Sequence, residues 1–179
     1  MMPNCRPMDR LLHWTAAVLI AAGALRMLGS FVPRAIAPAA AVQSLYLMTD
    51  ICILLGLIGW YAAIHQATGS SGFIGFVLGV VGILIIRSSA AFPDIDLYPP
   101  GALVFEVGLN ALALAAWKTQ RLPAWVPVLL LLSVAAGAVS YTSADLSWLL
   151  ILSGVLFGIG AAGIGWSLRP GSQEATVAA

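Results

Sequence analysis

The chain has 179 residues, of which 61% are apolar and 8% are charged, and its net charge is +1. A soluble domain carries roughly 25% charged residues, so this chain lacks the polar surface that water requires. The composition excludes a soluble globular domain and a disordered chain, and the balanced charge excludes a nucleic-acid-binding protein. Cys5 lies at the terminus and Cys52 in an apolar run, which offers no disulfide framework or zinc cluster. The sequence predicts a small polytopic membrane protein.

Apolar stretches follow one another along the chain at the length of transmembrane helices, which need about 20 apolar residues each. Six such stretches are predicted, at residues 11–32, 45–65, 72–90, 101–117, 124–140 and 146–168. Turn-forming residues separate them, including Pro33, Pro38, the run Gly69-Ser70-Ser71, Pro93 and Pro123. The predicted fold is therefore all-α, a bundle of six transmembrane helices forming a single domain over residues 1–179.

Tryptophan and basic residues orient this bundle, because tryptophan favours membrane interfaces and basic loops stay in the cytoplasm. Threading the six spans places five tryptophans at the interface near the N-terminus (Trp14, Trp60, Trp117, Trp125 and Trp166) and Trp148 at the opposite one. Most basic residues fall on the N-terminal side as well (Arg6, Arg10, Lys118, Arg121 and Arg169), whereas Arg34 falls on the other. We therefore expect both termini in the cytoplasm and a multi-pass protein of the bacterial inner membrane.

A cleaved signal peptide over residues 1–41 is the alternative interpretation of the N-terminal region. The region has a basic start, an apolar stretch and the small residues Ala39, Ala40 and Ala41. Its apolar stretch is longer than the 7–15 residues usual in signal peptides, and Arg26 interrupts it. The sequence favours a retained first span.

Charged residues inside the predicted spans carry most of the functional information. Arg26, Asp50, Arg87 and Glu106 lie at one predicted depth in the outer half of the bundle, and Asn110 lies one turn deeper on the face of Glu106. Each charge costs about 2.5 to 3.5 kcal/mol at the bilayer centre, so such residues face the bundle interior and pair. We predict a polar cluster of these five residues, with Ser88, Ser89 and Tyr141 at its edge.

The cluster has two interpretations that the sequence leaves open. It is either a set of structural ion pairs that lock the helices together, or a site for a small ligand, a lipid headgroup or an ion. The sequence contains neither of the hydrolase motifs G-x-S-x-G and H-E-x-x-H. No catalytic residue and no metal site are therefore predicted.

Glycines form stripes on two of the predicted spans. Gly72, Gly75, Gly79 and Gly82 share one face of the third span, and the sixth span carries Gly154 and Gly158 followed by Gly160, Gly163 and Gly165. Such stripes let membrane helices pack closely. We expect packing within one bundle, with homodimerisation or contact with a partner membrane protein as the alternative use of these faces.

Histidine is the residue type that would hold a haem here. His13 and His65 both map to the inner interface, where they are conceivable axial ligands between the first two spans. Histidine also hydrates its ring at an interface next to residues such as Trp14 and Gln66. The sequence therefore predicts no cofactor, and haem ligation by His13 and His65 is the remote alternative.

Residues 45–61 read LYLMTDICILLGLIGWY and residues 72–89 read GFIGFVLGVVGILIIRSS. This pair of spans, with an acid in the first and an arginine ending the second, resembles small uncharacterised multi-pass membrane proteins of high-GC bacteria. The resemblance implies a helical membrane protein and no particular activity. We expect a non-enzymatic integral membrane protein whose polar cluster binds a small ligand, with transport as one use. The alternatives are an accessory or assembly subunit and, third, a haem-bearing redox protein.

Overall fold

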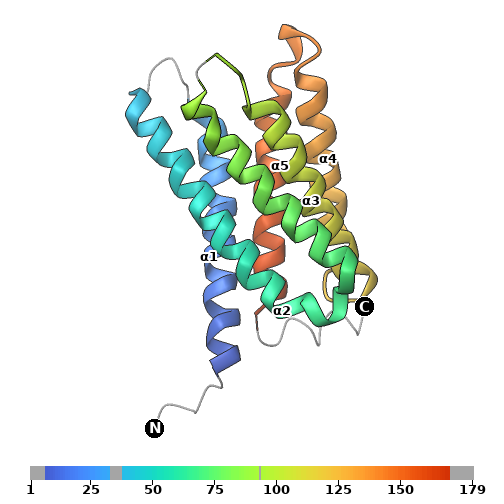
Figure 1. Cartoon of the computed structure of the whole chain (residues 1–179). Helices are drawn as coiled ribbons and strands as arrows, with labels where there is room; N and C mark the ends of the chain where they lie inside the picture. Colours follow the sequence, from blue (N-terminus) through green and yellow to red (C-terminus); the bar gives the residue numbers. More distant parts are fainter. Residues whose placement is uncertain (1–6, 33–37, 93, 170–179) are drawn as a thin grey trace.

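The computed structural model describes residues 7–32, 38–92 and 94–169, which form a helical bundle (Figure 1). The helices are α1 (Pro7–Phe31), α2 (Ala39–Ser88), α3 (Tyr98–Lys118), α4 (Trp125–Ser140) and α5 (Leu149–Ser167), with short 3₁₀ turns at Ser89–Ala91 and Ala144–Leu146. Within these ranges no strand occurs, so the predicted all-α class is confirmed. The expectations for Cys5, Arg6, Pro33, Arg34 and Pro93 lie outside the described residues.

The bundle has five helices rather than the six that the sequence predicts, because α2 contains both the second and the third predicted spans. Gly69 interrupts it with φ 57° and ψ −146°, a backbone conformation that essentially only glycine adopts. The chain reverses there, and Figure 1 shows two arms of α2 returning toward the same end of the bundle. Asp50 and Arg87 are in contact although 37 residues separate them, whereas an unbroken helix would hold them about 55 Å apart.

Length and composition make four of the helices able to cross a membrane: α1, α2, α3 and α5. Helix α4 is equally apolar but has 16 residues. Large apolar side chains are exposed on every helix, for example Leu28, Leu55, Ile74, Leu132 and Ile151. Such a surface is suited to lipid contact, because a soluble protein rarely exposes continuous apolar area.

Neighbouring helices run up and down between two ends of the bundle. Helix α1 packs on α5 and on α2, α3 packs mainly on α2, and α4 packs on α5. Figure 1 places the reversal of α2 at the same end as the start of α1 and the end of α5, here called the turn end. The opposite end holds the start of α2, the 3₁₀ turn Ser89–Ala91, the start of α3 and residues 141–148, and is called the cavity end. Helix α3 begins there earlier than predicted, because Pro99 and Pro100 fit the first turn of a helix.

The glycine stripes face other helices of the same chain. A Cβ atom on Gly75, in the second arm of α2, would lie 2.6 Å from the backbone nitrogen of Leu112 in α3. One on Gly158 of α5 would lie 2.6 Å from the carbonyl oxygen of Gly23 in α1. Gly163 faces Trp125 at the start of α4. These contacts are the packing within one bundle that the sequence favours.

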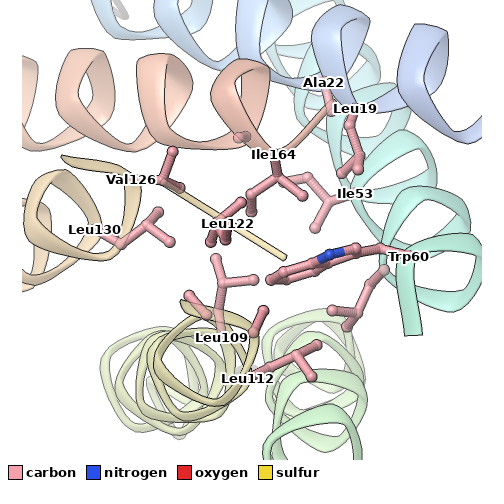
Figure 2. Packing of buried hydrophobic residues seen from close by; sticks show 14 of the residues in the cluster. Leu19, Ala22, Ile53, Trp60, Leu109, Leu112, Leu122, Val126, Leu130 and Ile164 are labelled. Carbon is pink, nitrogen blue, oxygen red and sulfur yellow. The ribbon is translucent and has the colours of Figure 1, made fainter. Parts of the chain in front are cut away.

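The side chain of Trp60 is buried in the bundle, whereas the sequence predicts it at the membrane interface. It is 1% exposed, and its ring projects between the helices toward Leu109 and Ile164 (Figure 2). The other tryptophans are exposed, from 43% for Trp117 to 68% for Trp14. The reason is that α2 continues for nine residues beyond Trp60 before the reversal at Gly69, about 13 Å at 1.5 Å per residue. Trp60 is therefore a core residue.

Candidate functional site

Two adjoining cavities occupy the cavity end of the bundle. The inner cavity has a volume of about 80 Å³ and the outer one about 700 Å³. All four charged residues of the predicted cluster line the inner cavity: Arg26, Asp50, Arg87 and Glu106. Its remaining wall is mostly apolar, with Phe105 and Phe157 among the lining side chains. The structure thus brings together charges from α1, from both arms of α2 and from α3.

Asp50 and Arg87 form an ion pair between the two arms of α2. The Arg87 Nε donates a hydrogen bond to Asp50 Oδ2 at 2.6 Å, and Nη2 of the same guanidinium donates to the same oxygen. The Arg87 side chain is 36% exposed and the Asp50 side chain 20%. The charge of Asp50 in the first arm is therefore neutralised by Arg87 at the end of the second arm.

Arg26 and Glu106 stand on opposite helices, α1 and α3, and both face the inner cavity. Among the described residues, Asp50–Arg87 is the one ion pair with nitrogen and oxygen within 4 Å, so Arg26 and Glu106 are farther apart than that. Each still lies within electrostatic range of the other, and Tyr98 and Tyr46 are the further polar neighbours of Arg26. The two charges therefore face a common space without direct ion pairing.

Asn110, the fifth residue of the predicted cluster, lies outside both cavity walls. Its side chain is 6% exposed, and its Nδ2 donates to the Glu106 carbonyl oxygen at 2.9 Å. Its Oδ1 is buried without a hydrogen-bond partner within the described structure. Asn110 thus lies beneath the site, on the helix turn below Glu106.

The outer cavity adds residues that the sequence analysis did not assign to a site. Five residues line both cavities and form the boundary between them: Arg26, Tyr46, Ile86, Arg87 and Tyr98. The outer wall also includes Ser30, Gln43, Asp96, Ser147, Leu150 and Ile151, together with Ser89 and Tyr141, which were expected at the edge. Ser88 instead donates to the Leu84 carbonyl oxygen on its own helix. Tyr98 was identifiable in principle, because it lies two turns before Glu106 on the same helix face.

The two histidines considered as haem ligands lie apart from these cavities, and Asp96 of the outer wall uses its carboxylate locally. His13 and His65 are exposed, and the His65 Nδ1 lies 2.9 Å from the carbonyl oxygen of Ala62 on its own helix. Asp96 accepts a hydrogen bond from the Tyr98 backbone nitrogen at 3.1 Å. No group of three metal-ligating side chains occurs in the described part of the chain.

Comparison with protein-family models, with curated proteins and with solved structures finds no match to this chain. The functional argument therefore depends on the cavity and its charges.

The contribution of the ion pair between the arms of α2 to the stability of the bundle can be measured by substitution. We expect Asp50→Asn to lower the free energy of unfolding by about 2 kcal/mol, less than for a fully buried pair because both side chains are partly exposed. Arg87→Gln should cost a similar amount. Unfolding by dodecyl sulfate in mixed micelles, followed by circular dichroism, measures both. The double variant should cost no more than one single variant, and strictly additive costs would contradict a direct interaction.

Proposed function

We propose that the chain is an integral protein of the bacterial inner membrane that binds a small polar ligand in the charged cavity. Six crossings are proposed, with each arm of α2 crossing once and α4 crossing as a shorter helix. The turn end holds the start of α1, the end of α5 and four described basic residues: Arg10, Lys118, Arg121 and Arg169. Basic residues on one side support a cytoplasmic location for that end. Asp94, Asp96 and Asp145 belong to the opposite end.

The observation that carries ligand binding is the incomplete pairing of charges around a cavity. A purely structural cluster of two bases and two acids would form two ion pairs. Of these four residues, only Asp50 and Arg87 are within 4 Å of each other as an ion pair. Arg26 and Glu106 instead line about 80 Å³ of space that continues into about 700 Å³. Cavities of roughly 300–1,000 Å³ with a few convergent polar groups are typical of small-molecule sites.

The other functions considered receive less support. An accessory subunit would use its glycine faces for a partner, whereas these glycines pack on α1, α3 and α4 of the same chain. A haem held by His13 and His65 would lie at exposed positions outside the charged cavity. Ligand binding, with transport as its extension, therefore remains the proposal.

Native mass spectrometry of the protein in mild detergent, with Glu106→Gln as the variant, tests this function. We expect a bound small molecule to be retained by the wild type and released at least about 10-fold more readily from the variant, because the ligand loses one charged contact. The matched control is Glu106→Asp, which keeps the charge. Equal retention by all three proteins, with a lower unfolding stability only in Glu106→Gln, would show that the cluster is structural.

A further inference from the structure

The inner cavity has an unusual charge balance for the interior of a bundle that crosses a membrane. Its four charges sum to zero, and Asp50 and Arg87 already neutralise each other. One cation, Arg26, and one anion, Glu106, are left on opposite walls. Neither charge has a partner within 4 Å that would form an ion pair in the described structure. Charges in a medium of low polarity are stabilised when a matching charge lies close by.

We propose that the cavity binds a free α-amino acid with an apolar side chain, its carboxylate on Arg26 and its ammonium group on Glu106. This inference rests on the proposed function and names its ligand class. A guanidinium offers paired N–H donors in the geometry of a carboxylate, and a carboxylate accepts hydrogen bonds from an ammonium group. A zwitterion matches both charges and adds no net charge to the membrane interior. An anion or a cation alone would leave Glu106 or Arg26 unmatched.

The dimensions of the two cavities agree with this orientation. The inner cavity, at about 80 Å³, has about one ninth of the volume of the outer one. That space suits the charged head of an amino acid and leaves no room for a large side chain. The side chain would extend past Tyr46 and Tyr98, which line both cavities, into the outer cavity. There Ile86, Leu150 and Ile151 provide an apolar wall.

A zwitterionic lipid headgroup has similar chemistry, and the choice of lipid in the experiment below distinguishes it from a free amino acid. The outer cavity is lined by residues of α1, both arms of α2, α3 and α5, and by Tyr141 directly after α4. Leu150 and Ile151 of this wall are 41% and 40% exposed, so the cavity also adjoins the outer surface of the bundle.

Radiolabelled leucine and two blocked derivatives provide the test. The full-length protein is placed in nanodiscs of phosphatidylglycerol, which contain no zwitterionic lipid, and leucine binding is followed by scintillation proximity. We expect saturable binding, with unlabelled N-acetylleucine and leucine methyl ester each competing at least about 30-fold more weakly than leucine. Arg26→Gln and Glu106→Gln should each weaken leucine binding by a similar factor. Arg121→Gln, an exposed arginine after α3, is the matched control and should bind as the wild type does.

The wild-type competition series keeps the inference testable even if a variant does not fold. Equal competition by N-acetylleucine would identify an anion site, and equal competition by the methyl ester would identify a cation site; either result overturns the zwitterion. Loss of leucine binding when the nanodiscs contain phosphatidylethanolamine would assign the site to a lipid headgroup. If leucine does not bind while Glu106 still determines retention of another small molecule in native mass spectrometry, the ligand class is wrong and the proposed function stands. If neither effect occurs, both fail.

Discussion

Trp60→Ala is expected to lower the free energy of unfolding by about 3 kcal/mol. Trp60 is the largest fully buried side chain, and it lies among core residues of several helices, including Leu109 and Ile164 (Figure 2). Removing the indole leaves a void that neighbouring helices can close only in part. We place the cost at the lower end of the range for soluble proteins, because unfolding within a lipid environment exposes the side chain to lipid rather than to water.

Two comparisons separate the cavity effect from a general effect of losing tryptophan. Trp14→Ala removes the same side chain from a position that is 68% exposed and should change stability by less than about 1 kcal/mol. Trp60→Phe should also cost less than Trp60→Ala, since the Trp60 Nε1 makes no hydrogen bond in the described structure that would be lost. Unfolding curves in mixed micelles, followed by circular dichroism, measure all three. Equal costs for Trp60→Ala and Trp14→Ala would contradict the core assignment.

Gly108→Ala is expected to cost about 3 kcal/mol, because α3 and the second arm of α2 touch through their backbones at this point. A Cβ atom there would meet the Gly79 nitrogen and would lie 2.7 Å from the Gly75 oxygen. Backbone atoms cannot rotate aside as a flexible side chain can. The two helices would have to separate along the whole stripe, which loses the packing that drives association of membrane helices.

Gly29→Ala is the matched control for this substitution. Its added Cβ atom would lie 3.5 Å from the nearest atom, on the side chain of Tyr46, which is ordinary van der Waals contact. We expect a change below about 1 kcal/mol, since alanine is the better helix former by roughly that amount. Thermal unfolding of both variants in the same detergent makes the comparison. A Gly108→Ala protein as stable as Gly29→Ala would contradict the close approach of the helices.

Hydropathy and turn residues predicted where the chain is helical, but not where a helix ends. The run Gly69-Ser70-Ser71 was expected to be a loop between two spans. In the structure Gly69 alone leaves the helical conformation, so one residue reverses the chain and the assigned helix continues through it. Trp60 was expected at the end of a span, but its ring is buried in the core, and α2 continues beyond it to Gly69. A tryptophan near the end of an apolar window resembles an interfacial anchor, yet the helix beyond it extends the bundle.

The candidate site was predictable because charge is costly in a bilayer. Four charged residues at one depth had to share a space, and Arg26, Asp50, Arg87 and Glu106 do line one cavity. Which acid pairs with which base was not predictable, since either arginine could reach either carboxylate. The reversal of α2 decides the matter by placing Arg87 next to Asp50. The tyrosines at the cavity boundary were missed because they bear no charge that hydropathy reveals.

The ion pair within α2 has a consequence for the order in which the bundle assembles. Asp50 and Arg87 belong to one hairpin, so they can neutralise each other as soon as that hairpin forms, before α3 arrives. Arg26 and Glu106 belong to α1 and α3, and they share a space only after both helices have docked on that hairpin. The hairpin is therefore electrically balanced by itself, whereas the space shared by Arg26 and Glu106 forms only when α1, the hairpin and α3 have come together.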